Sequence, residues 1–148
     1  ALFVDECSNV IARPLIELLN KGAEAGVRTT CAMQTVSDLA ARLGSEAAAR
    51  MALGNFNNLI ALRTKDRFTQ EFAAETFGRT YIANAESSVS STADGNALTF
   101  TAAVTRRRTS SRAELVPADV LGKLPNCEFF AALAGGKLVK GRIPILID

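Results

Sequence analysis

Short apolar runs alternate with amphipathic stretches through the first half of the chain. The runs are rich in aliphatic or β-branched residues, and the stretches between them repeat apolar residues at helical spacing. The expected strands are 1–4, 27–33 and 59–63. The expected helices are 14–25, 35–43, 45–53 and 64–77, and a glycine follows each of them. Thr35 or Ser37 can cap the second helix, Ser45 starts the third, and Thr64 caps the last one, with Asp66 in its first turn. This order predicts an α/β fold with a parallel sheet, whose first strand is buried on both faces.

A second pattern starts near Thr80, where a polar extended segment replaces the alternation of strands and helices. Asp94-Gly95 is typical of a tight turn between two strands. After it, Leu98, Phe100, Ala102 and Val104 alternate with polar or small residues, as in a strand with one buried face. We expect this hairpin to lie on the edge of the sheet or to project from it.

The C-terminal stretch combines further strands with one short helix. The strands are expected at 112–116, 128–133 and 138–146, and Pro117 begins a helix to about Leu124. The whole chain, 1–148, is therefore treated as one unit with three parts. These are a parallel α/β core (1–79), a hairpin extension (80–111) and a C-terminal β-α-β-β part (112–148).

Composition narrows the chemistry that the chain can perform. Its 148 residues contain no histidine, which excludes histidine-based triads and imidazole metal sites. The three cysteines are odd in number and far apart, which favours free thiols in a reducing compartment. The longest apolar runs, such as 129–134, are too short to cross a bilayer. A net charge of +2 is too small to identify a nucleic-acid partner.

Polar side chains that suit phosphoryl transfer follow the first two strands. Asp5-Glu6 ends the first run and Gln34 ends the second. Parallel strands bring their carboxyl ends to one sheet edge, where α/β proteins bind ligands. An apolar run ending in Asp-Glu is the Walker B pattern of P-loop ATPases, in which the first acid holds Mg²⁺ through water and the second prepares the attacking water. Gln34 can donate to a phosphate oxygen and accept from water.

Each residue alone has a plainer interpretation. The acidic pair can be the solvated end of an edge strand, and Gln34 can cap a helix. Their order and spacing favour the nucleotide site, with Asp5 and Gln34 on the nucleotide and Asp5, Glu6 and Gln34 as catalytic residues. Because the chain starts inside a predicted core strand, we expect it to be a fragment of a longer protein.

The ordered segments resemble the conjugative type IV coupling ATPases of the TraD/TraG group. The resemblance starts with the acid pair and the sensor Gln34, and it extends over nearly the whole chain. Its segments are 2–9, 14–19, 25–35 with Leu39, Leu43 and Gly44, 57–78 and 112–147.

That resemblance implies a RecA-like P-loop ATPase sheet, incomplete because it starts at the Walker B strand, with a hairpin and C-terminal antiparallel strands. It implies ATP and Mg²⁺ as cofactors and a DNA-translocating hexamer on the cytoplasmic face of the bacterial inner membrane. The implied partners are single-stranded or duplex DNA, the relaxase, a TraM-like relaxosome protein and the type IV secretion channel.

Two departures from the family pattern affect these expectations. No GxxxxGK[ST] phosphate loop occurs in the 148 residues, so we expect this chain alone to bind ATP weakly and not to turn it over. Relatives commonly carry an arginine eleven residues before the sensor glutamine, and that position is Ala23 here. Lys21 or Arg28 are the available substitutes, and neither is assigned.

The cluster Arg106-Arg107-Arg108 with Arg112 is the local candidate for DNA contact. The favoured alternative is a solvated hairpin end whose charge prevents edge pairing. Strand alternation places Arg107 on the opposite face from Arg106 and Arg108. No aromatic residue interleaves with these arginines in the sequence, which weakens the case for a stacking platform.

Two rival functions remain beside the ATPase interpretation. The chain can be a non-catalytic docking module for a relaxosome protein or DNA, or part of another translocase of the same fold, such as a chromosome-partition motor. A chain cut at the Walker B strand leaves an unpaired edge, so we also expect self-association, for instance as a non-physiological dimer.

Overall fold

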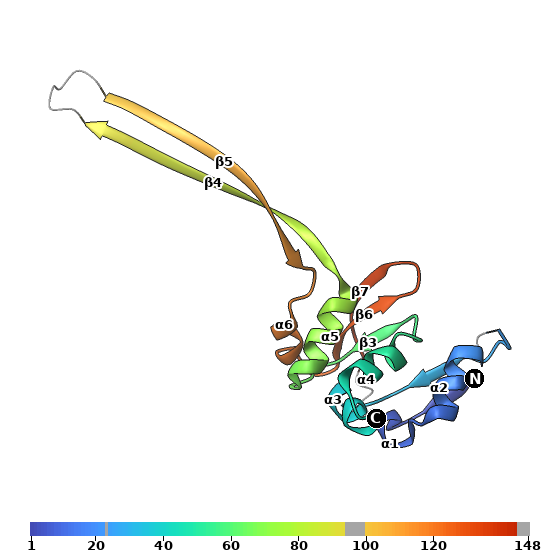
Figure 1. The fold of residues 1–148 in the computed structure, drawn as a ribbon. Coiled ribbons are helices and arrows are strands. Elements are labelled where there is room, and N and C mark those ends of the chain that lie inside the picture. Colours follow the sequence, from blue (N-terminus) through green and yellow to red (C-terminus); the bar gives the residue numbers. More distant parts are fainter. Residues whose placement is uncertain (23, 94–99, 145–148) are drawn as a thin grey trace.

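A computed structural model describes residues 1–22, 24–93 and 100–144 (Figure 1). The helices are α1 (Cys7–Val10), α2 (Arg13–Gly22), α3 (Val36–Leu43), α4 (Glu46–Leu53), α5 (Arg67–Phe77) and α6 (Ala118–Gly122). The strands are β1 (Leu2–Val4), β2 (Thr29–Cys31), β3 (Leu59–Ala61), β4 (Arg79–Ala93), β5 (Phe100–Glu114), β6 (Glu128–Leu133) and β7 (Lys137–Arg142). None of the helices in this described part combines the length and apolar character that a membrane span needs.

Strands β1 and β2 form a parallel pair. Leu2, Phe3 and Val4 lie opposite Thr29, Thr30 and Cys31, and the Ala32 N–H extends the ladder by donating to the Val4 carbonyl at 2.8 Å. The prediction that β1 is buried on both faces was wrong. The Phe3 side chain is 77% exposed, because no element of the described chain covers that face.

The sequence also predicted a parallel sheet of three strands, and this prediction was wrong for the third strand, β3. Strand β3 pairs antiparallel with β6, which pairs in turn with β7. Leu59 lies opposite Ala132, far along the chain, so local periodicity does not reveal the pairing. The fold is nevertheless mixed α/β, and β6 occupies the range expected from the sequence. Strand β7 begins near its expected start but ends at Arg142, so the prediction was wrong for residues 143–144. The expected strand residues 145–146 lie outside the described part.

The caps of α3 and α4 are among the residues expected from the sequence, and the structure selects Thr35 over Ser37 for α3. The Thr35 and Ser45 hydroxyls accept from the N–H groups of Asp38 and Ala48, as Ncap side chains do. Gly44 ends α3 with a φ of 86°, a conformation that favours glycine. The expected cap of α5 was wrong: Asp66, not Thr64, is the Ncap residue. Its carboxylate accepts from the Thr69 N–H at 2.8 Å.

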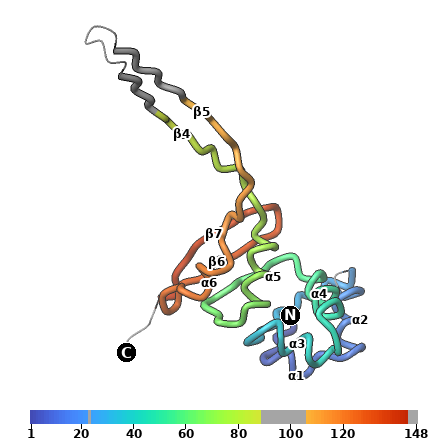
Figure 2. Tube along the Cα trace, turned by 60° about the vertical axis from the view of Figure 1, so that its left-hand side comes forward, coloured from blue at the N-terminus to red at the C-terminus, as the bar shows by residue number. Residues whose placement is uncertain are grey.

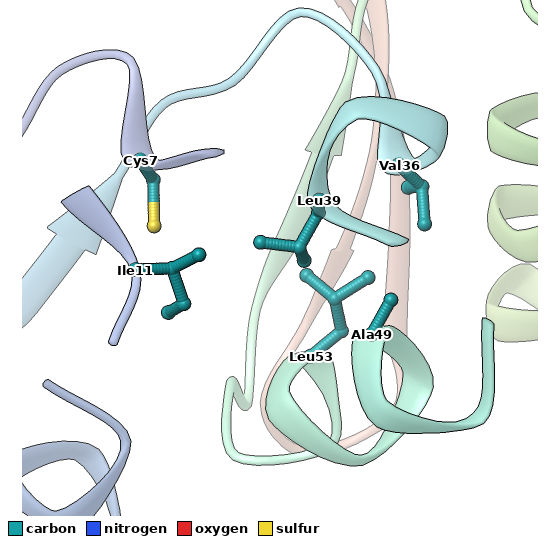
Figure 3. Close-up of a cluster of buried hydrophobic side chains, with 6 residues drawn as sticks. All are labelled: Cys7, Ile11, Val36, Leu39, Ala49 and Leu53. Atoms are coloured by element: carbon teal, nitrogen blue, oxygen red, sulfur yellow. The ribbon is translucent and has the colours of Figure 1, made fainter. Parts of the chain in front are cut away.

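Two apolar clusters form the core. The first packs α1, α3 and α4 together, with half-buried residues of β1, β2 and α2 around it (Figure 3); its buried members are Cys7, Ile11, Val36, Leu39, Ala49 and Leu53. The second lies where α5, α6 and the β3–β6–β7 sheet meet; its buried members are Ala61, Ala73, Phe77, Val116, Leu121 and Leu124.

Helix α5 belongs to both clusters. Its Phe68 and Phe72 pack against the first cluster, whereas Ala73 and Phe77 are buried in the second. This division follows from its helical periodicity, which presents different faces to the two sides. The helix therefore ties the β1–β2 end of the molecule to the antiparallel sheet.

Strands β4 and β5 form a hairpin of two 15-residue strands that projects away from the rest of the chain (Figure 1, Figure 2). The two short strands expected within 98–116 are one continuous strand as far as Glu114. The expected turn at Asp94-Gly95 and Leu98 lie outside the described residues. The side chains of Phe100, Ala102 and Val104 also lie outside the described part. That this strand buries one face therefore stays a prediction.

The start of α5 is joined to α3 through Asp66. Its carboxylate accepts from the Ser37 hydroxyl at 2.8 Å and from both the N–H and the hydroxyl of Thr69. The Val36 N–H also donates to the Thr69 hydroxyl at 2.8 Å. Partial burial disfavours the charged carboxylate, but the hydrogen bonds from Thr69 and Ser37 outweigh it, and the pKa of Asp66 lies below its ordinary value of 3.8.

We expect Asp66→Asn to destabilise the chain by about 1 kcal/mol at pH 7, because hydrogen bonds to a charged acceptor are stronger than those to a neutral one. The lowered folded-state pKa stabilises the wild type fully above 3.8. This contribution disappears as the pH falls through the folded-state value. Urea unfolding of both variants from pH 7 to pH 2.5 should show the difference shrinking below about pH 4. Ser37→Ala should give a smaller change with the same pH trend, and a pH-independent difference would contradict this account.

Candidate functional site

The carboxyl ends of β1 and β2 meet at one edge of the parallel pair. Asp5 and Glu6 follow β1 directly, and Gln34 follows β2 after Ala32 and Met33. The Gln34 side-chain N–H donates to Glu6 Oε1 at 2.9 Å. The structure thus brings together two residues that are 28 positions apart in the sequence and that the spacing had assigned to one edge.

Glu6 has an unusual backbone conformation. Its φ of 49° and ψ of 51° lie in the left-handed region, which costs a non-glycine residue roughly 1–2 kcal/mol. The Cys7 N–H donates to the Ala32 carbonyl, and the Asn9 N–H donates to the Glu6 carbonyl, each at 2.8 Å. These bonds hold the sharp turn from β1 into α1. The turn places the Glu6 side chain within reach of the end of β2.

Asp5 lies beside this pair rather than in it. Its side chain is exposed, and its Oδ1 accepts from the Glu6 N–H at 2.9 Å. The bond helps to fix the strained turn at Glu6. It also leaves the other carboxylate oxygen of Asp5 facing solvent without a hydrogen bond in the described structure.

An open depression of about 350 Å³ lies over the Glu6–Gln34 bond. Besides these two residues it is lined by Ser8, Asn9, Asp38, Ala41 and Arg42. Sequence reasoning did not identify this second group. A signal was present, because Asp38 and Arg42 are four apart on the helix that begins directly after Gln34 and so share one face of it.

The depression is polar and carries both signs of charge. Asp38 is already engaged by its own helix cap, since the Thr35 hydroxyl donates to it at 2.7 Å. Arg42, in the last turn of α3, is a cation that lines the same depression as Glu6. A larger depression of about 430 Å³ beside the β6–β7 turn has Lys137 as its only ionisable lining residue, so it offers no acid–base pair.

The side chains at the strand ends suit a magnesium–nucleotide complex. Carboxylate, amide and hydroxyl oxygens from Asp5, Glu6, Gln34 and Ser8 are the hard donors that Mg²⁺ prefers. No cluster of three carboxylate or cysteine side chains exists among residues 1–22, 24–93 and 100–144. A dedicated cage is not needed, because Mg²⁺ in nucleotide sites is held by one or two carboxylates together with phosphate oxygens and water.

The cysteines near the site are thiols rather than a disulfide. Cys7 is buried and Cys31 is half-buried, and both are free. Burial, together with the neighbouring Cys7 thiol, raises the pKa of Cys31 to about 12. A thiol with so high a pKa stays protonated at neutral pH and is a poor nucleophile. This leaves the carboxylates and the amide as the candidate groups for chemistry at this edge.

The other predicted site residues lie elsewhere. Lys21 and Arg28 are exposed and do not line the depression, and Ala23 is outside the described residues. Because the family arginine would act on the nucleotide of a neighbouring subunit, the choice between these two cations stays open. The hairpin strand β5 carries the four arginines of the basic cluster, Arg106, Arg107, Arg108 and Arg112.

Substitution by glycine or by alanine should affect the stability of the chain differently at Glu6 and at an ordinary helical position. The glycine variant should be the more stable one at Glu6 and the less stable one in a helix. We expect Glu6→Gly to be more stable than Glu6→Ala by up to about 1 kcal/mol, because glycine adopts positive φ without the side-chain clash. At Glu17, inside α2, the glycine variant should be the less stable one by about 1 kcal/mol. Thermal unfolding of the four variants measures both differences. A more stable alanine variant at Glu6 would show that the left-handed turn is absent in solution.

Comparisons with known proteins identify the family and the fold of the chain. Residues 1–126 match the family described as the TraM recognition site of TraD and TraG. Among curated proteins, no sequence matches the chain.

Solved structures of the bacterial conjugative coupling protein TrwB share the fold. The unbound form of TrwB lacking its first 70 residues is 22% identical, with a TM-score of 0.75 over 99% of this chain and 32% of that one. TrwB with the non-hydrolysable GTP analogue GDPNP is 21% identical, with a TM-score of 0.70 over 99% and 31%. TrwB with ADP and Mg²⁺ is 22% identical, with a TM-score of 0.72 over 99% and 30%.

This chain thus spans about a third of the length of those structures, and at this identity the likeness shows the fold alone. The family match covers most of the 148 residues. The chain belongs to the C-terminal TraG/TraD family of conjugative coupling proteins, the family described as the TraM recognition site.

Proposed function

We propose that this chain supplies the Walker B strand and the sensor strand of a RecA-like ATPase domain in a DNA-translocating conjugative coupling protein. The observation that carries the proposal is the hydrogen bond from Gln34 to Glu6 at the shared end of two parallel strands. It joins the expected catalytic acid to the expected phosphate sensor. The nucleotide complexes of TrwB, which has the same fold, support a nucleotide as the ligand.

The proposed roles divide among three side chains. Asp5 has one carboxylate oxygen free to hold a metal-bound water, while its other oxygen holds the turn. Glu6 keeps Oε2 as an acceptor that orients a water, and Gln34 keeps its side-chain oxygen and one N–H for phosphate or water. When bound, Mg²⁺ would neutralise phosphate charge. A change at Gln34 reaches Glu6 directly, because one hydrogen bond joins them.

The phosphate cradle is not in this chain, since no GxxxxGK[ST] string occurs in the 148 residues. Backbone N–H groups of such a loop supply most contacts to nucleotide phosphates. ATP turnover is therefore assigned to the longer protein and not to this chain by itself. The hexameric ring, the inner-membrane location, and contacts with the relaxase and the type IV secretion channel belong to the same proposal.

A second candidate function is docking of a TraM-like relaxosome protein. The family description favours it directly, because it names TraM recognition. Docking needs an accessible surface and does not need Asp5, Glu6 or Gln34. The two functions are compatible within one protein, and they are separable by mutation.

We expect Glu6→Gln to reduce Mg²⁺-dependent ATP hydrolysis of the intact coupling protein by at least 100-fold while nucleotide still binds, because the amide cannot take a proton from the attacking water. Steady-state phosphate release and nucleotide binding by fluorescence measure the two effects. Glu17→Gln, an exposed glutamate on α2, is the matched control and should leave both unchanged. Full activity of Glu6→Gln would refute the role given to Glu6.

Neutralising the acidic pair should leave partner docking intact. We expect the chain carrying Asp5→Asn and Glu6→Gln to capture a TraM-like protein with less than a threefold change in affinity, since neither carboxylate is needed for a docking surface. Calorimetric titration with the purified partner provides the measurement. A large loss of affinity in a variant with unchanged circular dichroism would place the docking surface at the strand ends instead.

A further inference from the structure

The register of the projecting hairpin sorts its arginines between two faces. Tyr81 lies opposite Arg112, Ala85 opposite Arg108 and Ser87 opposite Arg106. Directly paired residues of an antiparallel ribbon point to the same side, and successive residues point to opposite sides. Arg106, Arg108 and Arg112 therefore share one face, which we call the basic face. Arg107 lies on the other face, opposite Glu86.

The basic face includes an aromatic residue, Tyr81, that lies far from the arginines in the sequence. Tyr81 is 31 positions before Arg112 in the chain, yet the register places the two directly across from each other. The Tyr81 side chain is 73% exposed. No aromatic residue lies between these arginines in the sequence, yet the folded hairpin places one across from them, because strand pairing and not sequence order decides which residues are neighbours.

Between the Tyr81–Arg112 pair and the Ser87–Arg106 pair, the described side chains of the basic face include no acidic residue. The remaining positions on this face are small, and they are Ala83, Ala85, Ser87 and Ser110. All of them are exposed. Small neighbours leave the arginine and tyrosine side chains accessible to a flat or flexible ligand. Glu86 offsets Arg107 on the other face only.

We propose that the basic face of the β4–β5 hairpin binds single-stranded nucleic acid. Its three guanidinium groups span about 20 Å of extended strand and suit contacts to successive phosphates. Tyr81, exposed beside Arg112, offers a surface on which an unpaired base can stack. A role limited to blocking edge pairing does not require three arginines on one face, nor an exposed tyrosine among them.

The position of the hairpin supports this assignment. The ribbon projects from the rest of the chain (Figure 2), so a strand can reach the basic face without passing over the body of the molecule. The assignment adds a contact site for DNA to the proposed function. It rests on that function for the statement that the bound strand is DNA. The test measures DNA binding in the absence of ATP. The proposed nucleotide site and the proposed DNA contact can therefore fail independently of each other.

The experiment measures binding of a fluorescent 20-nucleotide thymidine strand to the full chain by anisotropy at several salt concentrations. We expect the triple variant Arg106→Gln, Arg108→Gln and Arg112→Gln to bind at least tenfold more weakly at 100 mM salt. The slope of log affinity against log salt should fall by about 2, because each lost phosphate contact on a single strand removes about 0.7.

Matched variants separate the basic face from overall charge. Arg107→Gln changes the neighbouring residue on the opposite face and should bind almost as wild type, whereas Arg108→Gln alone should bind several-fold more weakly. A second triple variant, Arg67→Gln, Arg107→Gln and Lys123→Gln, removes the same charge from other exposed positions and should also keep its affinity. Equal losses in Arg107→Gln and Arg108→Gln, or in the two triple variants, would overturn the proposal.

Tyr81 distinguishes an unpaired strand from a duplex. Tyr81→Ala should weaken binding of the single strand roughly five- to hundredfold, while Tyr81→Phe keeps it, because stacking needs the ring and not the hydroxyl. A duplex of the same length should be bound more weakly than the single strand and should not respond to Tyr81→Ala. Preference for the duplex would overturn the proposal. So would arginine-dependent binding to phosphatidylserine vesicles with no binding of the oligonucleotide, which would indicate a membrane surface instead.

Discussion

The parallel pairing of β1 with β2 is the constraint on which the candidate site depends. It gives both strands one direction, so that the residues following each emerge at one edge. An antiparallel pairing of the same segments would separate Glu6 from Gln34 by the length of the strands. The 2.9 Å hydrogen bond between them is thus a consequence of strand direction as much as of side-chain chemistry.

The turn at Glu6 requires stabilising interactions, because Glu6 is held in a left-handed conformation. The support comes from the residues next to it. The Cys7 N–H donates to the Ala32 carbonyl, and the Cys7 side chain is buried against Ile11 and Leu39 in the first apolar cluster. Strain at a functional position persists where the surrounding packing holds it. Here the packing also anchors α3, which contributes Asp38 and Arg42 to the same depression.

The hairpin is organised by a different constraint, the antiparallel register. In the described part of β4 and β5, this register separates Arg107 from the other arginines and brings Tyr81 to them. It requires no core beneath it, and the side chains that carry the proposed contacts are exposed. The site at the strand ends and the basic face thus rest on separate structural features. One is supported by tertiary packing, the other by pairing between two strands.

The sequence by itself determined the features that depend on near neighbours. These include the start of α4 at Ser45, the ends of α3, α4 and α5 at glycines, and the acid pair and amide after two apolar runs, because each is encoded within a few residues. Tertiary structure decided what depends on distant partners. It paired β3 with β6, exposed Phe3, placed Arg42 in the same depression as Glu6 and set Tyr81 opposite Arg112. Local periodicity reports which face of an element is apolar, but it does not report which other element lies against that face.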